Sequence, residues 1–246
     1  MTLNVNVIIP ARKGSEGLPG KNMQWLIDRP LTMHSIDFAK SITDNERILV
    51  TTDDPDLLTL SRSSGVFVPE KRPRHLASSR TPMADVVRYA LQLFPKSNAR
   101  PSPLVVLLDP TSPLRKPEWI VHAVAMLERN PESVGIVSVS RPSFNPEWVG
   151  VTLDSDDKLS RHPISQETFT RRQDVRPYWR INGGFYVWRW DFAARLETNW
   201  LDQGAHMGFE TPELMSHSID TDEDLQLVKD LLSCQIVSVP WMKEKR

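Results

Sequence analysis

Near its start the chain reads Val5-Asn-Val-Ile-Ile-Pro10-Ala-Arg-Lys-Gly-Ser-Glu-Gly-Leu-Pro-Gly-Lys-Asn22, an apolar run followed by a glycine-rich segment. A short run of β-branched residues that stops at a proline is typical of a buried strand in a parallel sheet. The segment after Pro10 carries three glycines and three cationic side chains. Because open α/β sheets bind ligands at the carboxyl ends of their strands, we expect residues 11–22 to form a ligand-binding loop.

The remaining sequence alternates between short apolar runs and amphipathic segments. Strands are predicted at residues 47–51, 104–108, 134–139 and 181–188, and helices at residues 30–42, 55–64, 82–94 and 117–130. This alternation predicts an α/β fold, a three-layer αβα domain with a mixed, mostly parallel sheet. In the third helix the apolar residues recur at helical spacing and are assigned to the core: Met83, Val86, Val87, Ala90, Leu91 and Phe94. A last helix is expected to begin near Thr221, where Thr221 and Asp224 fit a capping box.

The pattern of helices and strands weakens between residues 141 and 178. This segment is rich in proline and charged residues, and it has one short strand-like piece at residues 148–153. We therefore expect a single domain over residues 1–246 with a small inserted lobe at about 141–178.

Composition excludes several classes of protein. The 30 Lys and Arg against 31 Asp and Glu give a net charge of −1, so no basic excess is present to hold nucleic acid. One cysteine, Cys234, excludes an intrachain disulfide and suits a reducing compartment. The most apolar stretch, residues 104–108, is far shorter than the roughly 20 residues that span a bilayer, and the chain shows no signal-peptide pattern. We expect a soluble, cytoplasmic protein that binds neither nucleic acid nor membrane.

The loop after the first strand is suited to a polyphosphate. Glycines let backbone N–H groups approach an anion, and Arg12 and Lys21 can bracket phosphate oxygens from the two ends of the loop. A Walker A loop requires glycine six residues before Lys21, where Ser15 stands, and glycines at 14, 17 and 20 do not fit G-x-G-x-x-G. Kinase-type ATPases and Rossmann dehydrogenases are therefore disfavoured. The alternative is a glycine-rich surface turn with incidental basic residues.

Several blocks of sequence together resemble one family. They are Ile9-Pro-Ala-Arg-Lys-Gly-Ser15, Val50-Thr-Thr-Asp-Asp54, Leu107-Leu-Asp-Pro-Thr-Ser-Pro-Leu-Arg115, Arg171-Arg-Gln-Asp174, Arg180-Ile-Asn-Gly-Gly184 and Ile219-Asp-Thr-Asp-Glu-Asp-Leu225. In this order they resemble the acylneuraminate cytidylyltransferases, the CMP-sialic acid synthetase group. The resemblance implies a fold like that of the nucleotide-diphospho-sugar transferases. It also implies a reaction in which a sugar hydroxyl attacks the α-phosphate of CTP, pyrophosphate leaves and a CMP-sugar forms.

The resemblance also implies which residues bind the nucleotide. Arg12, Ser15 and Lys21 would hold the triphosphate, while Asn22, Arg72 and the backbone at 77–79 would border the nucleoside. The implied nucleotide-binding set is Ala11, Arg12, Gly14, Ser15, Lys21, Asn22, Arg72, Ala77, Ser78 and Asp109. Catalytic roles are assigned to Arg12, Lys21 and Asp220, since phosphoryl transfer depends mainly on positioning and on neutralising charge.

Magnesium is the expected cofactor because it bridges phosphate oxygens and accepts carboxylate ligands. The family commonly has the acidic motif D-x-D-T-x-x-D, but here its first two acidic positions are Ser218 and Asp220. Asp109 in turn stands where the family usually has glutamine. We infer that Asp109 and Asp220 form the metal pair. The acidic residues at 222–224 are interpreted as the start of a helix, where negative charge suits the helix dipole.

An acidic sugar acceptor is expected to meet the arginine-dense region near the lobe, because guanidinium groups bind carboxylates through paired hydrogen bonds. The candidate acceptor-binding residues are Arg172, Gln173, Arg180 and Asn182. A solvated basic loop or a salt-bridged dimer surface is an alternative for the lobe arginines. The resemblance further implies a homodimer in which the lobe of one subunit reaches the acceptor pocket of the other.

Two other functions stay open on the sequence alone. One is a nucleotidyltransferase for another acceptor, such as an eight-carbon keto acid, a sugar phosphate or a phosphonate, and the departures at Asp109 and Ser218 keep it in play. The other is a catalytically silent nucleotide-binding protein that has lost its metal pair. The base that takes the proton of the sugar hydroxyl is not identified by the sequence.

Overall fold

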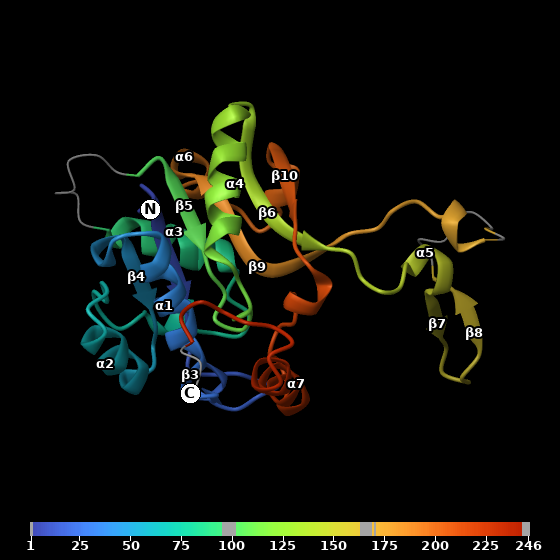
Figure 1. Ribbon diagram of the computed structural model, residues 1–246, viewed down its shortest axis with the longest axis horizontal. Helices are drawn as coiled ribbons and strands as arrows, with labels where there is room; N and C mark the ends of the chain where they lie inside the picture. The colour runs from blue at the N-terminus through green and yellow to red at the C-terminus, as the bar shows by residue number, and fades with distance from the viewer. Residues whose placement is uncertain (1, 95–101, 163–168, 170, 243–246) are drawn as a thin grey trace.

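A six-stranded sheet forms the centre of the computed structural model, which describes residues 2–94, 102–162, 169 and 171–242. The strand order is β10-β6-β9-β5-β1-β4. The bounds are β1 Asn6–Pro10, β4 Ile48–Thr51, β5 Leu104–Leu107, β6 Ser133–Ser140, β9 Arg180–Arg189 and β10 Ala205–Glu210. Strand β9 is antiparallel to both of its neighbours, whereas the other three pairs are parallel. The prediction of a mixed, mostly parallel sheet is confirmed (Figure 1).

Helices cover both faces of this sheet. They are α1 Leu31–Ile42, α2 Pro55–Ser63, α3 Met83–Leu93, α4 Pro117–Arg129, α6 Trp190–Ala193 and α7 Asp222–Ser233. Successive side chains of a strand point to opposite faces. Ile9 accordingly packs in the cluster that contains α1 and α4, and Ile8 packs in the cluster that contains α3 and α6. The result is the three-layer arrangement expected from the sequence.

A third apolar cluster lies near the carboxyl edge of the sheet. Leu18 of the glycine-rich loop and Leu26 of the short strand β2 (Trp25–Leu26), which pairs with β3 (Arg29–Pro30), pack there with Leu225 and Val228 of α7. Helix α7 begins with the predicted capping box, in which Thr221 and Asp224 bond each other's backbone N–H groups. The C-terminal helix is therefore packed against the segment that carries the loop.

The segment at 141–178 lies outside the six-stranded sheet. It contains α5 (Pro146–Val149), a separate antiparallel pair of β7 (Val151–Leu153) and β8 (Leu159–Arg161), and a 3₁₀ turn, η4 (Arg172–Asp174). We call residues 141–178 the lobe. It extends away from the body of the molecule, to which it is joined through β6 and β9 (Figure 1). The strand expected at 148–153 is wrong in its first half, because Asn145 caps a helical turn that begins at Pro146.

Two other sequence expectations differ from the structure. Met83, assigned to the core, is 43% exposed at the start of α3. Strand β10 was not predicted because Ala205-His-Met-Gly-Phe-Glu210 lacks a run of β-branched residues. Among the described helices, none has the length and apolar character needed to cross a membrane.

Candidate active site

The carboxyl ends of β1, β4 and β5 meet at one edge of the sheet, because these three strands are parallel neighbours. The glycine-rich loop follows β1, Thr52 and Asp53 follow β4, and Asp109 follows β5 within two residues. The sequence prediction of a loop at a strand end is confirmed. The same edge brings together the loop and two acidic side chains.

The loop is held to the neighbouring strand end by its own backbone. Three hydrogen bonds anchor it: Ala11 N–H to the Thr51 carbonyl (3.0 Å), Lys13 N–H to Asp53 Oδ1 (2.8 Å), and Asn22 Nδ2 to the Arg12 carbonyl (2.8 Å). Ala11 is fully buried, while Gly14 is exposed and Ser15 is half-buried. Asn22, expected at the nucleoside, thus also closes the loop across its two ends.

Gly17 brings the loop against the segment before α7. A methyl group at this position would overlap the carbonyl oxygen of Asp220. The absence of a side chain is therefore required for this close approach, and it places the loop beside Asp220.

We expect Gly17→Ala to lower the free energy of unfolding by about 1–3 kcal/mol, because the added methyl group overpacks this contact. We also expect it to weaken nucleotide binding, since the loop must shift. Gly14→Ala is the matched control for stability, because nothing lies within 4 Å of a Cβ at Gly14. Thermal unfolding and calorimetry with CTP check both variants. Equal melting temperatures for the two would contradict the close approach.

Lys21 and Asp220 form an ion pair across 199 residues of sequence, with 2.7 Å between Nζ and Oδ1. The Lys21 side chain is 15% exposed, whereas that of Asp220 is 64% exposed. The guanidinium group of Arg12 makes no hydrogen bond or ion pair with the described part of the chain. The three residues assigned to catalysis thus comprise one cation without such a partner and one cation that bonds the acidic residue.

Arg72 is 4% exposed and lies under this edge. It donates through Nη2 to the Thr51 carbonyl at 2.8 Å, and its Nε is buried with no partner among the described residues. Burial lowers the pKa of Arg72 to about 10, while the nearby charge of Asp53 raises it and that of Arg12 lowers it. Arg12 and Arg72 therefore form a cationic pair near the loop. Ala77 and Ser78 follow in the same segment, half-buried and exposed, respectively.

Asp109 is oriented by its neighbours. Its Oδ1 accepts hydrogen bonds from the Thr111 N–H at 3.1 Å and the Thr111 hydroxyl at 2.9 Å. Its backbone carbonyl accepts from Nη2 of Arg115, a fully buried arginine that also donates to the Gly184 carbonyl and to Ser35 Oγ. Burial lowers the pKa of Arg115, and the charge of Asp109 opposes this shift. Arg115 thus ties the end of β5 to β9 and α1.

Thr111 also links the two residues assigned to the metal. Its hydroxyl accepts from Ser218 Oγ at 3.0 Å, and its carbonyl accepts from the Ile219 N–H at 2.8 Å. Asp109 and Asp220 therefore flank the same contact between two segments. Ser218, the departure from the family motif, serves in that contact through its hydroxyl group.

The two acceptor candidates on β9 are already bonded within the chain. Arg180 pairs with Glu213 Oε1 at 3.0 Å, and its Nη2 also donates to the Ser216 carbonyl. Asn182 is 5% exposed, and its amide makes four hydrogen bonds. Its partners are Ser138 Oγ (2.6 Å), the Gly184 N–H (3.1 Å), Thr211 Oγ1 (2.8 Å) and Ser216 Oγ (2.9 Å).

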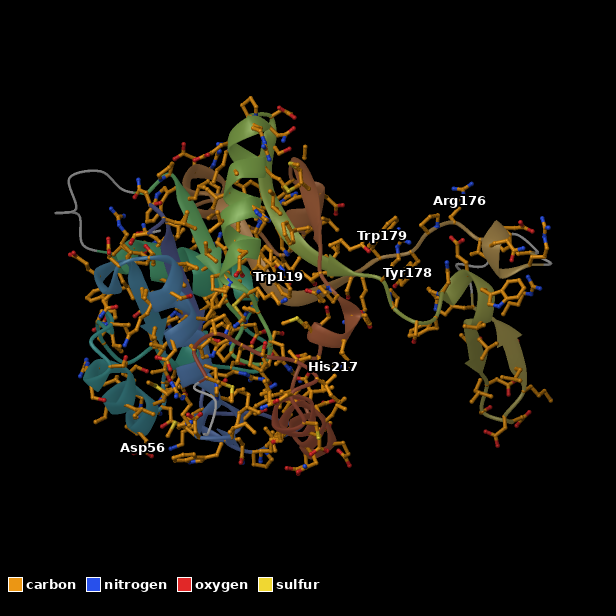
Figure 2. All side chains as sticks on the ribbon, viewed as in Figure 1. Asp56, Trp119, Arg176, Tyr178, Trp179 and His217 are labelled. Atoms are coloured by element: carbon orange, nitrogen blue, oxygen red, sulfur yellow. The ribbon has the colours of Figure 1, made fainter. Side chains whose placement is uncertain are left out.

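The other two acceptor candidates lie on the lobe. Arg172 and Gln173 belong to η4, and Gln173 is exposed. Figure 2 labels Arg176, Tyr178 and Trp179 along the chain that leads from the lobe back to β9. Because the lobe extends away from the sheet, Arg172 and Gln173 are not brought together with the loop of their own chain (Figure 1).

Sequence reasoning missed several side chains at this edge. Tyr186 and Trp188 line a cavity beside Asp109, and Glu213 pairs with Arg180. The period-two alternation of β9 identifies Tyr186 and Trp188 as sharing one face, so this signal was present in the sequence. Glu213 gave no local signal, because its contact with Arg180 spans 33 residues.

Comparisons with known proteins are consistent with this geometry. The model of the cytidylyltransferase family matches residues 6–244. CMP-N,N'-diacetyllegionaminic acid synthase of Legionella pneumophila is 35% identical over 75% of this chain and 78% of that protein. N-acylneuraminate cytidylyltransferase of Escherichia coli O18:K1:H7 is 30% identical over 76% of this chain but only 42% of that protein.

Among solved structures, CMP:2-keto-3-deoxy-manno-octonic acid synthetase in complex with CTP has the same fold. The match has a TM-score of 0.68 at 19% identity, and it covers 94% of this chain and 99% of that one. The family match spans nearly the whole chain and includes the loop, Asp109 and Asp220. The chain therefore belongs to the cytidylyltransferase family.

Proposed function

We propose that this enzyme transfers CMP from CTP to the anomeric hydroxyl group of a sialic acid-like nonulosonate, an acidic keto-sugar of nine carbons. The hydroxyl oxygen forms a bond to the α-phosphorus, the bond from that phosphorus to the bridging oxygen breaks, and pyrophosphate leaves. The hydroxyl proton is released, and the product is a CMP-sugar. The observation that carries the proposal is the anchored loop with Arg12 and Lys21, beside Asp109 and Asp220, in a chain 35% identical to a CMP-legionaminic acid synthase.

The nucleotide half of the proposal assigns the triphosphate to the loop. Arg12, with no hydrogen-bond or ion-pair partner in the described chain, and Lys21 would bind phosphate oxygens. Charge-assisted hydrogen bonds of this kind stabilise the charge that spreads over the transferred phosphoryl group. Asn22, Arg72 and the segment at 77–78 would border the nucleoside, with cytosine as the preferred base.

Magnesium belongs to the proposal, with Asp220 and Asp109 as its protein ligands. Asp220 is largely exposed, and Oδ2 of Asp109 makes no hydrogen bond in the described chain. No group of three or more metal-binding side chains is found in the described ranges. Two carboxylates nevertheless suit Mg²⁺, which commonly takes one or two carboxylates and completes its shell with phosphate oxygens and water. Once bound, it would neutralise phosphate charge.

The acceptor half of the proposal uses Arg180 of the same chain and the lobe of another. Nη1 of Arg180 makes no hydrogen bond in the described chain and could bind a sugar carboxylate. Asn182 would act by holding the strand end in place. Because Arg172 and Gln173 lie on the extended lobe, we assign them to the acceptor site of a second subunit in a homodimer. The single cysteine suits a cytoplasmic location.

The apolar surface of the lobe supports the homodimer. Val151, Leu153 and Leu159 are 54%, 64% and 68% exposed, although all three are large apolar residues. We expect the paired substitution of Leu153 and Leu159 by Glu to convert the protein from a dimer to a monomer. Light scattering checks this against the 28.1 kDa of one chain. Ile236→Glu, at a residue 61% exposed outside the lobe, is the control that should stay dimeric. A monomeric wild type would contradict the assignment.

An eight-carbon keto acid is the second candidate acceptor. It is favoured by the fold match to a synthetase for such an acid and by the departure at Asp109. A pyrophosphate-release assay with the four nucleoside triphosphates and a panel of acceptors separates the candidates. We expect turnover with CTP and a nonulosonate. Turnover only with the eight-carbon acid or with a sugar 1-phosphate would overturn the nonulosonate assignment, and CTP binding without pyrophosphate release for any acceptor would identify a silent homologue.

A further inference from the structure

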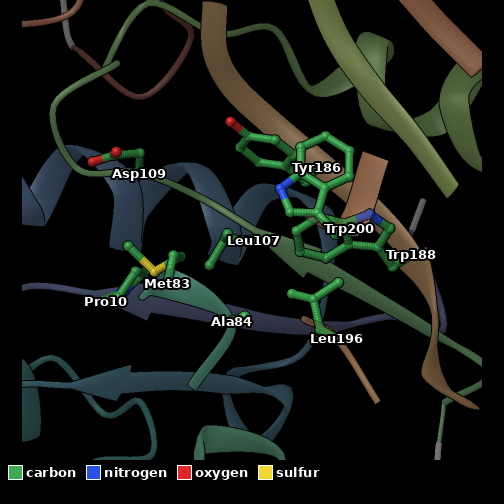
Figure 3. Close-up of a pocket in the computed structure, with 9 residues that line it drawn as sticks. All are labelled: Pro10, Met83, Ala84, Leu107, Asp109, Tyr186, Trp188, Leu196 and Trp200. Atoms are coloured by element: carbon green, nitrogen blue, oxygen red, sulfur yellow. The ribbon is translucent and has the colours of Figure 1, made fainter. Parts of the chain in front are cut away.

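A cavity of about 220 Å³ lies beside Asp109 at the edge of the sheet (Figure 3). It is bordered by the ends of β1 and β5, by β9 and by the first turn of α3. Its remaining wall comes from the segment after β9. The side chains that give the cavity its character are Asp109, Tyr186, Trp188, Ala84, Leu196 and Trp200. The nucleotide loop and the proposed metal pair do not account for this space.

The polar groups of the cavity lie toward one end. Figure 3 shows the Tyr186 hydroxyl group pointing to the side on which Asp109 lies. Burial raises the pKa of Tyr186 to about 12, and the negative charge of Asp109 adds to the effect. These two groups can bond a polar part of a ligand at the mouth of the cavity.

The rest of the cavity is apolar. Ala84, Trp188 and Leu196 are each buried, at 4%, 1% and 1% exposure. A hydroxyl group placed among these side chains would lose its hydrogen bonds to water without gaining a partner. A methyl group would gain from leaving water. The cavity therefore discriminates by polarity.

The volume limits what can enter. About 220 Å³ is below the roughly 300–1,000 Å³ of sites that enclose a whole small molecule. A nine-carbon sugar does not fit inside, but a single substituent does. The sugar ring would stay at the mouth, near Asp109 and Tyr186.

Trp200 forms a wall that the sheet does not fix. It lies in η5 (Trp200–Asp202), in the connection from α6 to β10. Its ring contacts Tyr186 edge-on at 5.7 Å and His206 at 5.0 Å between centroids. Trp200 is only half-buried, whereas Trp188 in the strand is fully buried. Trimming Trp200 would therefore enlarge the cavity with less disturbance of the core.

We propose that this cavity receives a small apolar substituent of the acceptor, an acyl methyl group or a deoxy terminus, and that Trp200 sets the size that is accepted. The inference rests on the proposed function, because it concerns the acceptor of that reaction. It makes Trp200 a specificity-determining residue.

Pairs of acceptors that differ at one position test the polarity of the cavity. One pair compares an N-acyl with a free amino substituent, and the other compares a methyl with a hydroxymethyl terminus. We expect kcat/KM to favour the apolar member of at least one pair by roughly 10–200-fold, the range typical of small changes in an apolar pocket. The pair that responds identifies which substituent enters. Equal turnover within both pairs overturns the inference while leaving the proposed function intact.

Trp200→Ala tests the role of the wall. We expect acceptors with an acyl chain two or three carbons longer to gain at least tenfold relative to the wild-type ratio, with the KM for CTP unchanged. Ala84→Val, which fills the cavity, should weaken apolar acceptors with the same unchanged KM for CTP. Trp25→Ala, at a residue 59% exposed on β2, is the matched control.

The outcomes of this experiment separate two failures. If Trp200→Ala and Ala84→Val change all acceptors equally, or change the KM for CTP, the cavity does not select the substituent. If no acceptor releases pyrophosphate with the wild type, the proposed function fails first and the inference fails with it.

Discussion

Lys21→Ala is expected to lower kcat/KM for CTP by about tenfold to a hundredfold. A charge-assisted hydrogen bond contributes roughly 1.5–3 kcal/mol, and each 1.4 kcal/mol lost from the transition state costs a factor of about ten in rate. Lys21 Nζ lies 2.7 Å from Asp220, so its removal takes away a cation next to the carboxylate proposed to hold magnesium. Initial-rate pyrophosphate release at varied CTP measures the effect.

Stability should change little in this variant, because the Asp220 side chain is 64% exposed and remains solvated without its partner. Lys158→Ala is the control, since Lys158 forms an exposed pair with Asp156 on the lobe. If Lys21→Ala uses CTP as well as Lys158→Ala does, the triphosphate is not held by the loop.

Arg115→Met is expected to lower the free energy of unfolding by about 2–6 kcal/mol. The substitution leaves the carbonyl groups of Asp109 and Gly184 buried without their donor, and an unsatisfied buried acceptor costs about 1–3 kcal/mol. Because Arg115 also holds the backbone of Asp109, we expect activity to fall by more than the loss of folded protein explains. Urea unfolding and activity per folded molecule measure the two effects.

Arg88→Met is the matched control for this variant. Arg88 pairs with Asp85 on the exposed side of α3, with 41% of its side chain exposed. Exposed ion pairs contribute about 0–1 kcal/mol, so this change should barely move the unfolding midpoint. An Arg115→Met protein as stable as Arg88→Met would show that the buried hydrogen bonds are replaced by water or by other donors.

The strands and helices with strong local patterns were predictable from the sequence. The bounds of α1 and α4 agree with the predicted ranges to within one residue, because the apolar residues of these helices recur over several turns. Strand β10 was not predictable in this way. Its backbone pairs with β6, while none of its side chains is fully buried, so it lacks the apolar pattern that identifies a strand.

Met83 shows the limit of periodicity as a guide to the core. It has the correct helical spacing, but the first turn of α3 reaches past the sheet, so Met83 borders the cavity instead of packing inside. A helical pattern gives the face of a residue and not how far the covering layer extends.

The candidate site was predictable only in part. The loop and its cations follow from the short segment 11–22, whose glycines and charges carry the information locally. The pairing of Lys21 with Asp220 and that of Arg180 with Glu213 depend on contacts between distant segments. Asn182 was chosen for its place beside two glycines, but its burial and four hydrogen bonds are properties of the folded chain.

The lobe leaves the sheet and returns to it at adjacent points, because Ser140 at the end of β6 is paired with Arg180 at the start of β9. An excursion that starts and finishes on one rung of the sheet can be shortened, lengthened or exchanged without changing the register of either strand. The catalytic edge and the lobe can therefore diverge separately, with the chemistry kept in the body while the lobe adapts to a new acceptor or a new partner.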